Sequence, residues 1–240
     1  FNSYAKAIEA IGKAAGNKPL PDRMGISVKL SALHPRYLAT HKDRVMNELV
    51  PLVLDLARKA KSYDLNFTID AEEADRLELS LAVIDAVFAA KSLDGWDGFG
   101  LAIQAYQKRA GAVIAHVEAL SKRLGRKMMV RLVKGAYWDT EVKRAQERGL
   151  DGYPVFTRKA ATDASYMACA RQMLNARPTL FPQFATHNAL TVAAIMEMAG
   201  ADKTGFEFQR LHGMGETLYK SVTEGGDKIA CRIYAPVGGY

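Results

Sequence analysis

Short apolar runs alternate with longer amphipathic segments along most of the chain. The runs are continuously apolar, which is typical of parallel strands buried on both faces. They predict seven strands, at residues 25–30, 66–70, 98–103, 128–133, 183–186, 206–211 and 228–234. We therefore expect a sheet that is covered on both sides.

The segments between these runs have helical spacing. In the first of them, apolar residues such as Val45, Leu49 and Val53 recur four positions apart, with charged residues between them. Such a stripe is typical of a helix that packs one face against a sheet. The spacing predicts helices at residues 44–60, 77–88, 112–124, 161–174 and 191–198.

The alternation of strands and helices predicts an α/β fold with a parallel sheet and right-handed crossovers. An open doubly wound sheet and a closed barrel both satisfy this pattern. The chain shows no duplicated half and no linker, so we expect one domain over residues 1–240, cut from a longer protein because it starts at Phe1. Seven strands after a truncated start favour a (βα)8 TIM-type barrel that lacks its first strand.

The composition narrows the class of protein. Lysine and arginine number 33 against 26 acidic residues, which gives a net charge of +7. The cations are dispersed instead of lying in a stripe with exposed aromatic residues, so the pattern disfavours nucleic-acid contact. Cys169 and Cys231 lack CxxC spacing, and we expect both to be free thiols in a reducing compartment.

Polar and charged residues recur where the predicted strands end. Burying such groups without partners is costly, so a plain core would not choose them. In an α/β barrel the chemistry lies at the carboxyl ends of the strands, which predicts a shared site there. The residues concerned are Lys29, Asp70, Gln104, Arg131, Lys134, Thr186, His187, Asn188, Glu207, Gln209, Arg232 and Tyr234.

The residue types in this set indicate anion binding beside an aromatic ring system. Lys29, Arg131 and Lys134 could hold an anionic substrate group or stabilise negative charge on a cofactor. Asp70 could anchor a cation or act as a base. The glycine after Lys134 would let a cofactor approach the backbone closely, and Tyr137 offers a flat face for stacking.

Motifs for nucleotide binding and for metal binding are incomplete or absent in the sequence. Gly98-Phe99-Gly100 and Gly213-Met214-Gly215 do not complete a GxGxxG motif, and GxxxxGK[ST] is absent. The histidines show no paired-ligand spacing. Two alternatives stay open: a barrel hydrolase with a metal on Asp70, Glu72 and His187, and a basic nucleic-acid-binding module.

Seven segments match a family pattern in the same order. The chain resembles the proline dehydrogenase domain of bacterial proline utilization A proteins over nearly its whole length. The segment RLVKGAYWD is the most specific of the seven. The matching segments are 27–37 (SVKLSALHPRY), 69–73 (IDAEE), 104–109 (QAYQKR), 131–139 (RLVKGAYWD), 184–188 (FATHN), 206–215 (FEFQRLHGMG) and 232–238 (RIYAPVG).

The resemblance implies a flavoenzyme with non-covalent FAD across the carboxyl face of the barrel. Such an enzyme oxidises L-proline to Δ1-pyrroline-5-carboxylate by hydride transfer from C5 of proline to N5 of FAD, and passes electrons to a membrane quinone. It also implies a pyrroline-5-carboxylate dehydrogenase domain in the full-length chain. A cytoplasmic location with peripheral contact at the inner membrane would follow.

Residue roles carry over with the resemblance. Arg131 and Asp70 would be catalytic, and Lys29, Asp70, Tyr137 and Tyr234 would bind proline. No metal is implied. The residues that would bind FAD are Gln104, Arg131, Val133, Lys134, Gly135, Ala136, Trp138, Thr157, Arg158, Lys159, Thr186, His187, Asn188 and Gln209.

Two elements of the family pattern fall outside these 240 residues. A strand precedes the region where this sequence starts, and a last helix with paired arginines follows its end. Those arginines grip the substrate carboxylate in the family. We therefore expect the isolated segment to bind proline poorly.

Overall fold

Seven strands form one parallel sheet in the residues that the structure, a computed structural model, describes: 1–226 and 228–236. Each strand pairs with the next in chain order, from β1 to β7. Val237 and Gly238, which end the last family segment, lie outside the described residues. The strands are β1 (Gly25–Val28), β2 (Asn66–Ile69), β3 (Phe99–Gln104), β4 (Met128–Val133), β5 (Leu180–Ala185), β6 (Glu207–Leu211) and β7 (Cys231–Tyr234).

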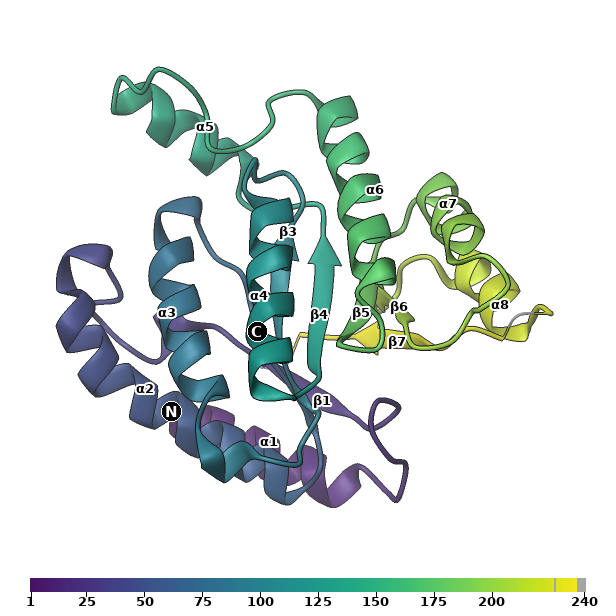
Figure 1. Cartoon of the computed structure of the whole chain (residues 1–240), viewed down its shortest axis with the longest axis horizontal. Helices are drawn as coiled ribbons and strands as arrows, with labels where there is room; N and C mark the ends of the chain where they lie inside the picture. The colour runs from purple at the N-terminus through teal and green to yellow at the C-terminus, as the bar shows by residue number, and fades with distance from the viewer. Residues whose placement is uncertain (227, 237–240) are drawn as a thin grey trace.

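One helix, α1, precedes β1, and the helices that follow β1 to β6 cover the outside of the sheet (Figure 1). Parallel strands all begin at the same end of the sheet, so each helix must carry the chain back to that end. Right-handed crossovers place these helices on one side of the sheet, which is its outside. α5 lies beyond the carboxyl end of β4 (Figure 1). The helices are α1 (Asn2–Ala14), α2 (Lys42–Ser62), α3 (Leu77–Phe88), α4 (Ala110–Leu124), α5 (Trp138–Glu147), α6 (Lys159–Asn175), α7 (Ala189–Ala199) and α8 (Glu216–Glu224).

The sheet curls so that its two edges approach each other. Arg232 on β7 donates hydrogen bonds to the carbonyl oxygens of Pro21 and Arg23, which precede β1. The Nη1 to Arg23 oxygen distance is 2.7 Å. The sequence prediction of a parallel α/β sheet is confirmed, and the curl is that of a barrel and not of an open doubly wound sheet.

Three helices, α1, α5 and α8, escaped the sequence prediction. Each of them buries only one or two residues, which in α8 are Tyr219 and Val222. In α1, Ile8 is the buried residue, and in α5 the buried residues are Glu141 and Ala145. Two strands also begin three residues away from their predicted starts. β5 begins at Leu180, three residues before the predicted position. β7 is shorter than predicted and starts at Cys231.

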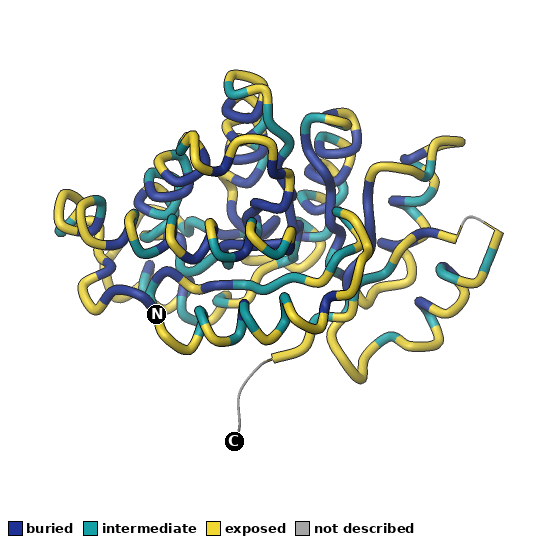
Figure 2. Tube along the Cα trace, turned by 90° about the horizontal axis from the view of Figure 1, so that it is seen from below, coloured by how far each residue is buried: buried dark blue, intermediate teal, exposed yellow. Residues whose placement is uncertain are grey.

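The strands β2 to β6 are buried along most of their length, whereas exposed residues gather on the outer turns of the helices (Figure 2). All four residues of β2 are buried. Burial on both faces explains why the strands look continuously apolar in the sequence. Successive side chains nevertheless alternate between two environments, one facing the helices and one facing the inside of the curl.

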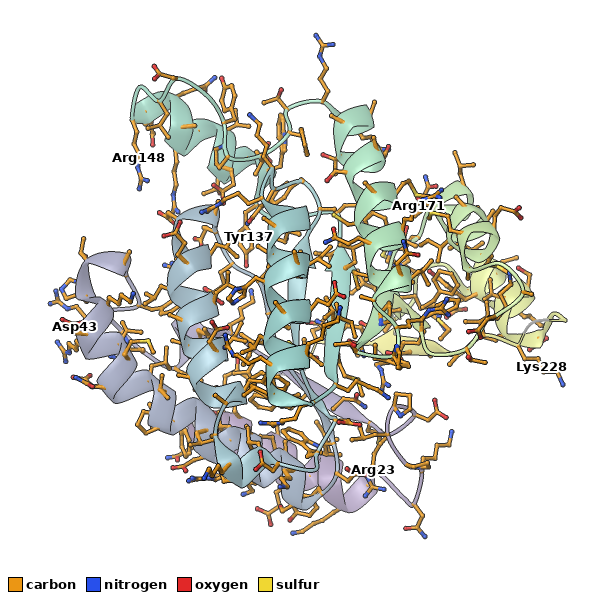
Figure 3. All side chains as sticks on the ribbon, viewed as in Figure 1. Arg23, Asp43, Tyr137, Arg148, Arg171 and Lys228 are labelled. Atoms are coloured by element: carbon orange, nitrogen blue, oxygen red, sulfur yellow. The ribbon has the colours of Figure 1, made fainter. Side chains whose placement is uncertain are left out.

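The two ends of the sheet differ in position and in role. Tyr137 lies toward the carboxyl end of the strands, whereas Arg23, which precedes β1, lies at the opposite end (Figure 3). Lys29 directly follows β1 and Asp70 directly follows β2. The predicted site residues are therefore carried to one end of the barrel.

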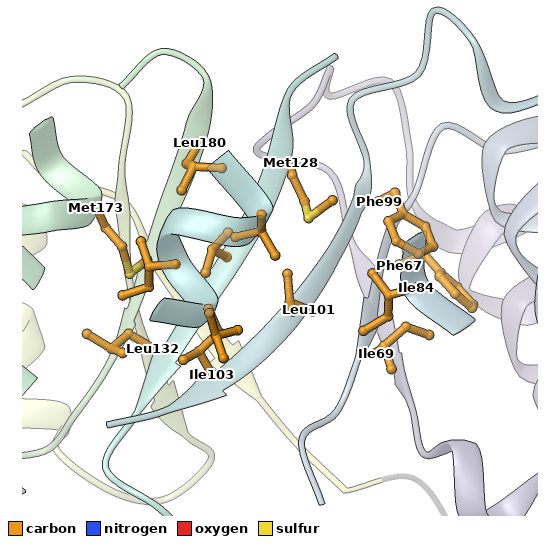
Figure 4. Close-up of a cluster of buried hydrophobic side chains, with 14 of the residues drawn as sticks. Phe67, Ile69, Ile84, Phe99, Leu101, Ile103, Met128, Leu132, Met173 and Leu180 are labelled. Carbon is orange, nitrogen blue, oxygen red and sulfur yellow. The ribbon is translucent and has the colours of Figure 1, made fainter. Parts of the chain in front are cut away.

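The apolar core lies between the strands and the helices. Phe67 of β2 and Phe99 of β3 stack with their ring centroids 6.0 Å apart, and Phe88 of α3 lies 5.6 Å from Phe99. Figure 4 shows this layer, with Ile84 of α3 directed toward the same strands. Each ring stabilises the fold by roughly 1.5–3 kcal/mol when fully buried. This layer makes the strand ends a rigid platform for the site.

Candidate active site

A cavity of about 640 Å³ opens at the carboxyl end of the strands. Its size is that of a pocket for a small molecule or a cofactor ring system. It is lined by residues that follow or end β1 to β7: Lys29, Asp70, Ala71, Ala102, Gln104, Arg131, Val133, Lys134, Gly135, Ala136, Tyr137, Lys159, Ala185, Thr186, His187, Asn188, Gln209, Arg210, Leu211 and Tyr234.

Arg131 is held in the cavity from three sides. Its Nη1 donates to Asp70 at 2.9 Å, its Nη2 donates to Ser27 at 2.8 Å, and its Nε donates to Gln209 at 2.8 Å. The guanidinium also lies 4.9 Å from the ring centroid of Tyr234. Arg131 is 8% exposed, so these contacts act in a region largely free of water and fix the plane of the guanidinium.

Burial and charge act in opposite directions on the acidic and basic groups of the cavity. Burial raises the pKa of Asp70, and the cations Arg131 and Lys29 offset part of that rise. Burial lowers the pKa of Lys29, but Tyr137 and Asp70 outweigh this effect, so that the net shift is upward. Lys29 therefore stays cationic, and its Nζ lies 3.5 Å from the Tyr137 hydroxyl.

Gln104 connects two of the loops that follow the strands. Its Nε2 donates to the carbonyl oxygen of Glu72 at 2.8 Å, and its Oε1 accepts from the backbone N–H of Ala136 at 3.0 Å. The loop after β4 therefore has a fixed position relative to the loop after β2. Gln104 lines the cavity while holding both loops.

Gly135 allows the chain to pass close to an aromatic ring. Its φ is +143°, and a Cβ at this position would lie 2.4 Å from Cγ of Tyr106. The Tyr106 hydroxyl accepts from the backbone N–H of Tyr137 at 3.2 Å. The glycine is therefore required both by its backbone conformation and by the space around it.

A second group of cations lies at the start of α6. Lys134 and Lys159 both line the cavity, and both donate to the carboxylate of Asp163, with Lys159 at 2.7 Å. Hydrogen bonds from Lys134 and Lys159 lower the pKa of Asp163. Two lysines share one carboxylate, so this side of the cavity keeps a net positive charge.

The loop after β5 combines cavity lining with helix capping. The Asn188 side chain accepts from the backbone N–H of Thr191 at 2.9 Å and caps α7. The Asn188 backbone N–H donates to the hydroxyl of Thr186, and His187 Nε2 accepts from the backbone N–H of Leu211 at 3.0 Å. These contacts fix the wall that Thr186, His187 and Asn188 form.

Three residues predicted to bind the cofactor lie outside this lining. Trp138 is 43% exposed, and its Nε1 donates to the carbonyl oxygen of Phe156 at 3.0 Å. Thr157 and Arg158 are exposed and lie just before α6. Their roles remain predictions from the family resemblance, because the cavity of the described residues stops short of them.

Several lining residues were missed by the sequence reasoning. Arg210 and Leu211 line the cavity beside Gln209, and Ser27 holds Arg131. The spacing along the strands could have identified two of them. Ser27 lies two positions before Lys29, and Leu211 lies two positions after Gln209, so each shares a strand face with a predicted site residue. Ala71, Ala102 and Ala185 also line the cavity, but alanine carries no signal in a single sequence.

The metal-hydrolase alternative lacks its site. No group of three His, Cys, Asp or Glu residues that could hold a metal ion exists in the ranges 1–226 and 228–236. Glu72 instead accepts from the backbone N–H of Ser31 and pairs with Arg76 at 2.8 Å.

Among the same described residues, no helix has both the length and the apolar character needed to cross a membrane.

The fold and the site together define an α/β barrel of the TIM type with a polar, cationic cavity at the carboxyl end of its strands. Residues 1–240 match the protein family described as Proline dehydrogenase. The bifunctional protein PutA of Salmonella typhimurium is 53% identical over 242 residues, which cover 98% of this chain and 18% of that protein. The chain therefore belongs to the proline dehydrogenase family and spans 18% of the length of that relative.

Solved structures agree with this assignment. A crystal structure of a mutant of Bradyrhizobium japonicum proline utilization A (PutA) has 70% sequence identity and a TM-score of 0.97, and the match covers 99% of this chain and 24% of that chain. PutA from Bdellovibrio bacteriovorus inactivated by N-propargylglycine has 29% identity and a TM-score of 0.92, with 99% and 26% covered. The predicted barrel class is confirmed by these likenesses.

Proposed function

We propose that this chain is the catalytic barrel of an FAD-dependent proline dehydrogenase, which oxidises L-proline to Δ1-pyrroline-5-carboxylate. Membership of the family supports the reaction. The observation that carries the proposal is the Arg131 guanidinium, fixed on three sides in a cavity whose walls also supply two separate groups of cations. A hydride acceptor that gains negative charge is stabilised by such a fixed cation.

The donors around the cavity fit a flavin dinucleotide. Lys134 and Lys159 would hold the phosphates, since their shared carboxylate on Asp163 leaves one positive charge in excess. Gly135 would let the ring system approach the backbone. Bound FAD would supply the two-electron acceptor for the hydride that leaves C5 of proline. The remaining predicted FAD contacts, from Gln104, Val133, Ala136, Trp138, Thr157, Arg158, Thr186, His187, Asn188 and Gln209, belong to the same proposal.

Proline would bind beside Arg131. The cationic Lys29 would bind the proline carboxylate, and Asp70 would hold Lys29 and Arg131 in place through its charge. The rings of Tyr137 and Tyr234, which both line the cavity, would enclose the proline ring. These residues bind and orient the substrate, and alignment of the reacting atoms accounts for a large part of the barrier that they lower.

The wider setting of the reaction is part of the same proposal. Relatives are described as bifunctional, which supports a pyrroline-5-carboxylate dehydrogenase domain elsewhere in the full-length protein. Electrons would leave the site for a membrane quinone. The full-length protein would work in the cytoplasm, with peripheral contact at the inner membrane.

A visible absorption spectrum of the full-length protein tests the proposal. We expect a yellow protein with flavin absorption bands that bleach when L-proline is added without oxygen. D-Proline, which presents its carboxylate with the opposite handedness, serves as the control and should bleach the bands far more slowly. A colourless protein, or bands that L-proline leaves unchanged, would contradict the proposed function.

A further inference from the structure

A buried carboxylate lies inside the barrel beneath the site. Glu207 on β6 is 1% exposed. Its carboxylate accepts from Gln183 Nε2 at 2.9 Å, from Gln209 Nε2 at 2.9 Å and from Arg232 Nε at 2.7 Å. Residues 207 and 209 are two positions apart on one strand, so both side chains point to the inside of the curl.

The charge of this carboxylate is balanced by an arginine from the neighbouring strand. Arg232 forms a two-point contact with Glu207, since its Nη2 also donates to Oε2 at 2.9 Å. Arg232 is itself fixed by the carbonyl oxygens of Pro21 and Arg23. An ion pair whose carboxylate is buried and whose groups make this many hydrogen bonds has a single favourable arrangement.

The ion pair determines which way the Gln209 amide points. An amide has a donor end and an acceptor end. In the observed orientation, the NH2 group of Gln209 faces the Glu207 carboxylate and its Oε1 faces Arg131. The flipped orientation would set oxygen against carboxylate and NH2 against guanidinium, and both contacts would be repulsive. Gln209 is 2% exposed, so water does not screen this choice.

We infer that Glu207 is a positioning residue for the reaction: it orients Arg131 through the side-chain amide of Gln209. The inference rests on the proposed function, in which Arg131 stabilises charge on the flavin. Ser27 and Asp70 hold the two outer nitrogens of the guanidinium, whereas the contact from Gln209 is made at Nε. Loss of the third contact would let the guanidinium pivot about the other two.

The test uses the full-length flavoprotein with Glu207→Gln, Arg131→Met and the double variant. Two quantities are measured: the rate of anaerobic bleaching by L-proline, and the midpoint potential of the bound flavin without proline. We expect Glu207→Gln to slow bleaching about tenfold and to shift the potential in the same direction as Arg131→Met. In the Arg131→Met background, Glu207→Gln should change neither quantity further.

A second variant keeps the test decisive if Glu207→Gln prevents folding. Gln209→Met leaves the Glu207–Arg232 ion pair intact but removes the relay, by which we mean the amide of Gln209 that links Glu207 to Arg131. This variant should reproduce the slower bleaching and the shifted potential. Gln183→Met removes a different partner of Glu207 that is equally buried, and should leave the potential unchanged. This matched variant separates loss of the relay from general disturbance of the barrel interior.

The results that would overturn the inference are specific. If the effects of Glu207→Gln and Arg131→Met multiply in the double variant, Glu207 does not act through Arg131. Equal shifts from Gln209→Met and Gln183→Met would also refute the relay. Failure of the proposed function would be distinct, because the wild-type flavin would then fail to bleach with L-proline at all.

Discussion

The Asp70 carboxylate accepts a hydrogen bond at 2.9 Å from Nη1 of Arg131, although 61 positions separate the two residues in the chain. Asp70 follows β2 and Arg131 lies in β4, so that β3 runs between them in the sheet. The contact forms across the inside of the curl, and it depends on both side chains facing the interior. It is therefore a direct sign that the strand ends converge on one site.

Removing the carboxylate partner of Arg131 should lower the stability of the protein. Asp70→Ala leaves the guanidinium without its carboxylate in a buried setting, and should lower the free energy of unfolding by about 3 kcal/mol. Urea denaturation measures this change. Asp85→Ala removes the partner of His116 from a more exposed pair and should cost less than about 1 kcal/mol. Equal losses in the two variants would contradict the assigned geometry.

Gly135 should tolerate no side chain. Gly135→Ala places a Cβ against the ring of Tyr106 and forces a residue with a Cβ to a φ of +143°. We expect a loss of about 1–3 kcal/mol in stability and weaker flavin retention, measured by urea denaturation and by the flavin content of the purified protein. Gly152→Ala, where nothing lies within 4 Å, is the matched control. Flavin content that is unchanged in Gly135→Ala would refute the role of this close approach.

The buried Glu141 should make stability depend on pH in a predictable direction. Burial raises the pKa of Glu141 above its ordinary value of 4.5, against the opposing effect of the hydrogen bond from the Ala74 N–H. The folded state therefore holds the proton more tightly than the unfolded state. Stability falls as pH rises from 4.5 through the folded pKa.

Replacement of this carboxyl by an amide removes the pH dependence. Glu141→Gln keeps an oxygen that can accept from the Ala74 N–H, which the carboxylate accepts at 2.6 Å. The variant should gain stability relative to wild type as pH rises through the window above 4.5, and should lose that advantage below it. Unfolding curves recorded across this range provide the measurement. A stability difference that stays constant with pH would show that the Glu141 carboxyl does not titrate in this window.

The rate of proline oxidation should rise with pH. Hydride leaves C5 readily when the neighbouring amine is neutral, so the reactive form of proline accumulates as the amine loses its proton. The pKa of Lys29 is raised above its ordinary value of 10.5, so the cation that would bind the carboxylate persists through this range. We expect kcat to increase without a matching rise in KM. A flat rate across the titration of the amine would be inconsistent with this step.

Much of the site was predictable because polar residues stand out at the ends of apolar strands. Lys29, Asp70, Gln104 and Arg131 are polar residues in or after apolar runs, and burial cost alone marks them as unusual. Each shares a strand face with the residue two positions earlier. The parallel α/β class and the end of the barrel that holds the cavity followed from the same pattern.

Other features could not be read from single positions. α5 is mostly polar, and its two buried residues are Glu141 and Ala145, so no apolar run marks it in the sequence. Trp138 was predicted to bind FAD from the family resemblance, but its exposed position beside Phe156 depends on how the following loop folds back. The relay from Glu207 through Gln209 depends on contacts between three strands, which no local pattern encodes.

The central claim is that Arg131 stabilises the reaction in the cavity at the strand ends. The most direct test compares Arg131→Met with His116→Ala, an exposed histidine on α4, in anaerobic bleaching of the flavin by L-proline. We predict that Arg131→Met slows bleaching about hundredfold and that His116→Ala leaves the rate unchanged. Equal rates in the two variants would contradict the account.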